Sequence, residues 1–123
     1  MGDAVSGARE PLHAPQVIML GDFSLTSRRE GGIHSIRLFG ELDLATADAV
    51  EKELLRVEAT DADPIIVDLS GLTFIDSTGA RLLVYAAARS REHSDRLALL
   101  RGGAAVQRVF QLTALEDKLP FVD

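Results

Sequence analysis

The sequence predicts a single α/β domain whose helices pack on a mixed β-sheet. From residue 46 onwards, apolar strand-like runs alternate with segments in which apolar residues recur at helical spacing. Such alternation produces βαβ crossovers, so these strands are expected to be largely parallel. Before residue 40, two extended segments are joined by Gly31-Gly32, which suits the turn of an antiparallel hairpin. The length of 123 residues is that of one domain.

The hairpin and the first helix have clear local signals. Residues 22–27 alternate with a period of two, and residues 33–39 are rich in β-branched and aromatic side chains, as return strands are. Thr46 is the expected N-cap of the helix that follows, with Asp48 in its first turn, where the helix dipole favours an anion. Pro64 disfavours helical geometry just before it and so ends this segment.

The second half of the chain continues the alternation. Residues 65–69 predict a strand buried on both faces, and Gly71 predicts a turn before the extended residues 72–75. A second helix should begin in the segment 76–79, with Ser77 as its N-cap. Later elements are a strand at 96–100, a third helix that follows Gly102-Gly103 and carries Val106, Val109, Phe110 and Ala114 on one face, and an extended piece at 119–122.

The N-terminal segment is expected to be a flexible leader, residues 1–20, that precedes a domain spanning residues 21–123. Residues 1–16 are rich in Gly, Ala, Pro and charged side chains and have no sustained period. Residues 17–20 form a short apolar run that could begin a strand or belong to the leader.

Composition argues against several classes of function. The chain has no cysteine, which excludes disulfides, thiolate metal sites and thiol nucleophiles, and its net charge of −6 opposes binding to nucleic acid or anionic membranes. No export signal or membrane-spanning run is present. We therefore expect a cytoplasmic protein with no membrane insertion, and a monomer. No phosphate-binding glycine loop or metal-ligand spacing occurs, so neither enzymatic activity nor a cofactor or metal is expected.

The segment Phe74-Ile75-Asp76-Ser77-Thr78-Gly79 carries the main functional signal. Apolar residues lead directly into a hydroxyl-rich turn that becomes a helix. A hydroxyl at such a junction is exposed, and a phosphate attached there would lie at the positive end of the helix dipole. Gly79 has no side chain to shield the site. The local pattern alone favours a plainer interpretation, in which Ser77 is a simple helix cap and Gly79 a packing glycine.

A second segment, Gly40-Glu41-Leu42-Asp43-Leu44-Ala45-Thr46, ends the return strand. Its acidic residues could simply face solvent. However, the ends of neighbouring parallel strands meet at one edge of a sheet, which would bring Asp43 and Thr46 towards the turn at residues 76–79. A polar surface with little chemistry of its own is typical of a docking face.

These two motifs, in this order, resemble those of the STAS domain found in bacterial anti-sigma factor antagonists. The resemblance runs from about Asp22 to Val122. It rests on Gly40-Glu41-Leu42-Asp43 with Thr46-Ala47, on residues 67–79 (VDLSGLTFIDSTG), and more weakly on residues 105–110 (AVQRVF). It implies a STAS-like fold.

The resemblance also implies a switch. Such antagonists bind an anti-sigma factor and so free a sigma factor. The anti-sigma factor is often a serine kinase that phosphorylates the serine after the motif aspartate, here Ser77, and a PP2C-type, metal-dependent phosphatase reverses the modification. The partner-binding surface would comprise Asp43, Thr46, Asp76, Thr78, Gly79 and Arg81. Phosphorylation would add about −1.5 to −2 charges beside Asp43 and Asp76 and so repel the partner.

Two departures and three alternatives accompany this interpretation. Ala80-Arg81 stands where many relatives have Leu-Gly, so Arg81 could pair with Asp76 or with a phosphate, or alter the choice of partner. Ala114 replaces a glycine often found after Phe110, which we interpret as a packing adjustment. The alternatives are a STAS module with another partner (a stressosome-like scaffold or a lipid ABC transporter subunit), an enzyme with Ser77 as nucleophile, and a purely oligomerising domain.

Overall fold

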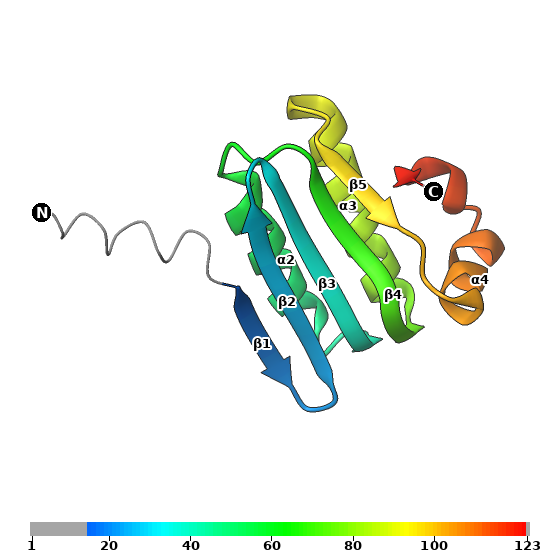
Figure 1. Ribbon diagram of the computed structural model, residues 1–123. Coiled ribbons are helices and arrows are strands. Elements are labelled where there is room, and N and C mark those ends of the chain that lie inside the picture. Colours follow the sequence, from blue (N-terminus) through cyan, green and yellow to red (C-terminus); the bar gives the residue numbers. More distant parts are fainter. Residues whose placement is uncertain (1–14, 123) are drawn as a thin grey trace, which may run out of the picture.

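The computed structural model describes residues 15–122 as one mixed sheet with helices packed on it (Figure 1). The elements, in order, are β1 (Gln16–Leu20), β2 (Phe23–Glu30), β3 (Ile33–Leu42), α2 (Ala47–Glu58), β4 (Ile65–Ile75), α3 (Ser77–His93), β5 (Leu97–Leu100), α4 (Ala104–Leu112), the 3-10 helix η1 (Glu116–Lys118) and β6 (Phe121–Val122). The six strands are ordered β1 to β6 across the sheet. β1, β2 and β3 pair antiparallel, and β3 to β6 pair parallel, which confirms the predicted mixed sheet.

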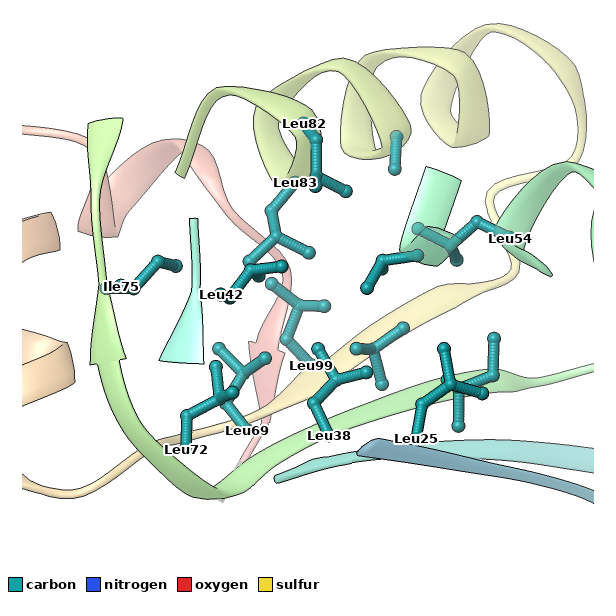
Figure 2. Packing of buried hydrophobic residues seen from close by; sticks show 14 of the residues in the cluster. Leu25, Leu38, Leu42, Leu54, Leu69, Leu72, Ile75, Leu82, Leu83 and Leu99 are labelled. Atoms are coloured by element: carbon teal, nitrogen blue, oxygen red, sulfur yellow. The ribbon is translucent and has the colours of Figure 1, made fainter. Parts of the chain in front are cut away.

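The sheet is covered on one face by α2 and α3, which lie behind it in the view of Figure 1. The core forms between these two helices and the central strands. Leu82 and Leu83 of α3 point towards Leu42, Leu69 and Leu99 of the sheet (Figure 2), and all five side chains are buried. Burial of each such side chain contributes about 1.5–3 kcal/mol, so this layer holds the helices in place.

The N-terminal strand corrects one expectation. Residues 16–20 were assigned to a flexible leader, but they form β1, which pairs with β2 in regular register from Gln16–Ser27 to Leu20–Phe23. The rest of the expected leader, residues 1–14, lies outside the described residues. Only Ile18 of β1 packs against the core. The other four residues are exposed. The segment therefore lacks the alternation of apolar and polar residues by which a half-buried strand is recognised in a sequence.

Gly71 does not form the expected turn. It lies within β4, a single strand of 11 residues. The pairing of β3 with β4 shifts between Arg37 and Phe39, so Gly71 lies opposite Phe39 at this irregularity. A Cβ atom on Gly71 would lie 2.5 Å from the Phe39 ring and 2.7 Å from the Leu38 carbonyl oxygen. The glycine therefore permits a close approach between strands.

The third helix is shorter than expected. α4 ends at Leu112, and Ala114 lies two residues beyond it with a φ of +58°. Ala114 therefore does not share the buried face of Val106 and Phe110, and its side chain is exposed. This left-handed position after a helix is one that glycine usually occupies, because a Cβ atom is strained there. The alanine is a backbone departure and not the packing adjustment expected from the sequence.

A buried polar cluster lies between α2 and the hairpin. The Ser27 hydroxyl and the Nε2 atom of His34 are 2.6 Å apart, and both side chains are buried. On α2, Arg56 donates two hydrogen bonds to the buried carboxylate of Glu53. Burial alone would raise the pKa of Glu53, but hydrogen bonds from Arg56 and Ser27 outweigh it and lower the pKa overall. The cluster fixes α2 over the hairpin.

No helix among residues 15–122 is both long and apolar enough to cross a membrane.

Candidate functional site

The two sequence motifs meet at the edge of the sheet where β3 and β4 end. Leu42 and Ile75 are partners at the last position of the pairing between these strands. One residue further on, the backbone N–H of Asp76 donates a hydrogen bond to the Leu42 carbonyl at 3.1 Å. Asp43 and Asp76 therefore follow neighbouring strands, and α2 and α3 begin just after them. Parallel pairing thus brings together segments more than 30 residues apart in the chain.

The N-cap of α3 is Asp76, one residue before the position predicted. Asp76 has extended backbone angles (φ −105°, ψ −175°), and its Oδ1 atom accepts a hydrogen bond from the Gly79 N–H at 2.9 Å. Aspartate and serine are equally good N-caps, so their order alone could not decide the boundary. Asp76 caps because it leaves the strand in an extended conformation, whereas Ser77 is already the first helical residue.

This shift leaves the Ser77 hydroxyl free. Ser77 is exposed, and within the described part of the chain its side chain has no hydrogen-bond partner. It lies in the first turn of α3, where backbone N–H groups lack helical acceptors and the dipole favours negative charge. An acceptor for a phosphoryl group needs both this accessibility and this tolerance of charge. Thr78 beside it is half-buried.

Gly79 is a packing glycine, which is one of the two roles that the sequence left open for it. The residue is buried, and a Cβ atom on it would lie 2.8 Å from both Cγ and the carbonyl oxygen of Leu42 and 2.9 Å from a side-chain carbon of Ile75. Gly79 therefore lets α3 start directly against the ends of β3 and β4. We had expected it to keep the site open, but its effect is to bring the Ser77 turn close to the β3 motif.

The loop after β3 is held by reciprocal hydrogen bonds. The Oδ1 atom of Asp43 accepts from the backbone N–H groups of Ala45, at 3.0 Å, and Thr46, at 3.2 Å. The Thr46 hydroxyl donates to the Glu41 carbonyl at 2.9 Å and accepts from the Asp43 N–H at 3.0 Å. Thr46 is the N-cap of α2, as expected, but its side chain makes no capping bond and is 7% exposed. Thr46 thus shapes the loop from within.

Arg81 is exposed on α3 and has no ion pair among the described residues, Asp76 included. It lies four residues after Ser77 and therefore on the same face of the helix. With Thr78 and Tyr85 of α3, and Ala47 and Glu51 of α2, it lines a shallow cleft of about 270 Å³. The sequence-predicted residues Thr78 and Arg81 thus extend the site from the Ser77 turn into the gap between the two helices.

Two exposed apolar residues border the site and were missed. Leu44, in the loop between Asp43 and Thr46, is 77% exposed, and Tyr85 is 58% exposed. Large apolar side chains left in water beside a polar motif are typical of docking surfaces. Leu44 stood within the recognised motif, where its exposure could have been noticed. Tyr85 lies on the side of α3 away from the buried Leu83 and Ala87, so helical spacing could have indicated its exposure.

No group of three or more histidine, aspartate or glutamate residues in the described range, 15–122, could hold a metal ion. The arrangement instead combines one free hydroxyl, two carboxylates that hold their own loops, one unpaired guanidinium and two exposed apolar side chains. It suits recognition by another protein.

Comparison with known proteins agrees with this fold. The STAS domain family model matches residues 24–123, and the chain belongs to this family. The curated relative RsfB of Mycobacterium tuberculosis, an anti-sigma-F factor antagonist, is 27% identical over 93 residues, which cover 76% of this chain and 75% of RsfB.

Two solved structures are similar. An anti-sigma factor antagonist from Mycobacterium paratuberculosis superposes with a TM-score of 0.70 at 24% identity, over 85% of this chain and 89% of that one. SpoIIAA of Bacillus, an anti-sigma factor antagonist in its unphosphorylated form, gives a TM-score of 0.62 at 25% identity and 89% coverage of each chain. The chain is thus a STAS domain protein related to anti-sigma factor antagonists.

Proposed function

We propose that this protein is an anti-sigma factor antagonist that is switched off by phosphorylation of Ser77. In its unphosphorylated form it binds an anti-sigma factor and so frees a sigma factor. The anti-sigma factor acts as the serine kinase, and a PP2C-type phosphatase restores the active form. The relationship to RsfB and SpoIIAA, named as anti-sigma factor antagonists, supports this assignment.

The single observation that carries the proposal is the free, exposed hydroxyl of Ser77. Because Asp76 takes over the capping bond to Gly79, Ser77 is not needed to hold the helix end. A kinase can therefore modify it without first breaking a native hydrogen bond. A phosphate at this position also lies at a helix N-terminus, where it is tolerated by the fold.

The effect of the phosphate is electrostatic. It would add about −1.5 to −2 charges at neutral pH. The neighbouring surface already carries the carboxylates of Asp43 and Asp76, and docking would remove water from all three groups. A penalty of a few kcal/mol weakens binding by two or more orders of magnitude, since about 1.4 kcal/mol corresponds to a factor of ten. The fold should change little.

The test is phosphoryl transfer to a defined residue. The purified chain is incubated with Mg²⁺-ATP and the anti-sigma serine kinases encoded in its own genome, and intact mass and peptide mapping locate any added phosphate. We expect one phosphate on Ser77, none on the Ser77→Ala variant, and normal labelling of the matched control Ser94→Ala, because Ser94 is exposed at the opposite end of α3.

The contrary outcomes are also defined. Persistent labelling of the Ser77→Ala variant would move the acceptor elsewhere. If no kinase labels the chain, and protein purified from its own cells is unmodified under several growth conditions, the switch is refuted. Binding to an ATPase in place of an anti-sigma factor would then favour a transporter-subunit role.

A further inference from the structure

β1 is an edge strand whose own five residues lack the usual protective features. It lies at one side of the sheet and pairs only with β2, so its outer N–H and C=O groups have no strand partner among the described residues (Figure 1). Natural edge strands are usually guarded by charges, prolines, bulges or shortness. β1 has five residues, Gln16–Leu20, without a charge or a proline, and its register with β2 is regular throughout. The opposite edge, β6, is only two residues long.

Four of the five side chains of β1, Val17 to Leu20, are apolar, and all of them except Ile18 are exposed. Val17 is 60% exposed and Met19 72% exposed, on the face that α2 and α3 leave open. On the other face, Ile18 and Leu20 line a groove of about 430 Å³ between β1 and α2. A strand with free backbone groups and apolar side chains on both faces is suited to pairing with another strand.

We propose that a second copy of this chain pairs with β1 in antiparallel orientation about a two-fold axis near Ile18. This register places Val17 opposite Met19 of the second copy and Ile18 opposite its own counterpart. The three central pairs are then apolar on both faces of the joined sheet, and Gln16 lies opposite Leu20 at each end of the five-residue strand. Two-fold pairing of identical surfaces is the commonest geometry of homodimers. The paired strand, β1, is the edge of the sheet, whereas Ser77 follows β4. The groove beside β1 adjoins the site, because Ala45 lines it and Asp48 lines both the groove and the cleft beside Arg81. The inference does not depend on the proposed function.

Charge on α2 favours a second copy over another partner. The groove is bordered by Asp48 and Lys52, which form an exposed ion pair on α2. A two-fold axis makes the two copies of α2 antiparallel. The order of these two charges is therefore reversed between the copies. Asp48 of one copy and Lys52 of the other lie towards the same end of the joined groove. β1 itself has no charged side chain that could form an ion pair with a charged peptide.

The expectation of a monomer rested on the small size of the domain and its net charge of −6. At physiological salt, charges separated by more than about 8 Å are largely screened, whereas strand pairing acts at contact distance. A five-residue strand and one groove form a small interface, so the dimer should be weak and dependent on protein concentration.

The experiment measures the mass of the full chain in solution as a function of concentration. Sedimentation velocity from about 5 μM to about 500 μM should show the mass rise from 13.3 kDa towards twice that value. Amide hydrogen exchange should show protection of residues 16–20 that increases over the same range. A constant mass of 13.3 kDa, with exchange at residues 16–20 independent of concentration, would overturn the proposal.

Variants connect the association to β1. Met19→Lys and Val17→Lys place a charge on the edge at exposed positions, and each should abolish the rise in mass while circular dichroism shows a folded chain. The matched control is Leu112→Lys on α4, where the side chain is 77% exposed. Each change makes the net charge less negative and so reduces the repulsion between two copies. This effect alone would strengthen association, so a loss of the dimer cannot be caused by net charge. If both β1 variants still dimerise, or the control loses the dimer equally, the β1 interface is refuted.

Discussion

The Oδ1 atom of Asp76 accepts a hydrogen bond from the backbone N–H of Gly79 at 2.9 Å. Because of this contact, two adjacent residues of the motif have different roles. Asp76 holds the end of the helix, and Ser77 is left exposed and free of hydrogen bonds within the described structure. Modification of Ser77 therefore need not disturb the fold. A switch that acts through the binding of a partner protein requires this property.

Ser77→Asp should weaken binding to the anti-sigma factor at least tenfold and change the free energy of unfolding by less than about 1 kcal/mol. An anion in the first turn is tolerated by the helix dipole, while the added charge opposes docking. Isothermal titration calorimetry and urea unfolding measure the two effects. Ala104→Asp is the matched control, because Ala104 is the exposed first residue of α4, and it should bind normally. Equal affinity of Ser77→Asp and wild type would contradict an electrostatic switch.

Asp43 requires two variants, because the structure gives its side chain a conformational role. Asp43→Ala removes the acceptor for the Ala45 and Thr46 N–H groups and should cost about 1–2 kcal/mol of stability. Asp43→Asn keeps an acceptor oxygen but removes the charge, so it should be closer to wild type in stability. If the charge contributes to docking, Asp43→Asn should reduce affinity for the anti-sigma factor. Unchanged affinity in both variants would remove Asp43 from the interface.

Ala114→Gly should stabilise the protein by about 0.5–1 kcal/mol. Ala114 has a φ of +58°, which strains any residue with a Cβ atom, and glycine relieves this strain. Ala88→Gly is the control, because Ala88 lies inside α3, where glycine should destabilise by about 1 kcal/mol. Thermal unfolding followed by circular dichroism measures both. A loss of stability at residue 114 would show that the unfolded chain's gain in entropy outweighs the strain.

His34 should make stability dependent on pH. Its pKa is lowered, first by burial and then by the charge of Arg56, so the folded state binds its proton less readily than the unfolded state. The free energy of unfolding should therefore fall as the pH is lowered below about 6.5 and until the lowered pKa is passed. Glu53 adds a loss only at more acidic pH, because its own pKa is lowered below the ordinary range of a carboxyl.

Urea unfolding of the His34→Gln variant should lack most of this slope between pH 7.5 and pH 5.5, whereas wild type should retain it. His93→Gln is the control, because His93 is exposed at the end of α3. If wild type and His34→Gln lose stability in parallel, His34 is not the group that titrates.

Much of the fold was predictable because its signals are local and repeated. The alternation of strand and helix patterns indicated the parallel part of the sheet, and Gly31-Gly32 indicated the hairpin. The family was recognisable from two motifs, and the family match agrees. The prediction failed where one residue had several possible roles. Gly71 suits a turn or a close approach between strands, and only the Phe39 ring opposite it decides for the second.

The order of the elements from β2 onwards and the two motifs that form the candidate site could be predicted from the chain alone. Hydrophobic periodicity and turn residues encode these features within a few neighbours along the chain. Three features became evident only in the folded molecule: Asp76 caps α3, Gly79 packs on Leu42, and β1 joins the sheet. These features depend on contacts with residues distant in the chain, and such contacts exist only once the strands have paired.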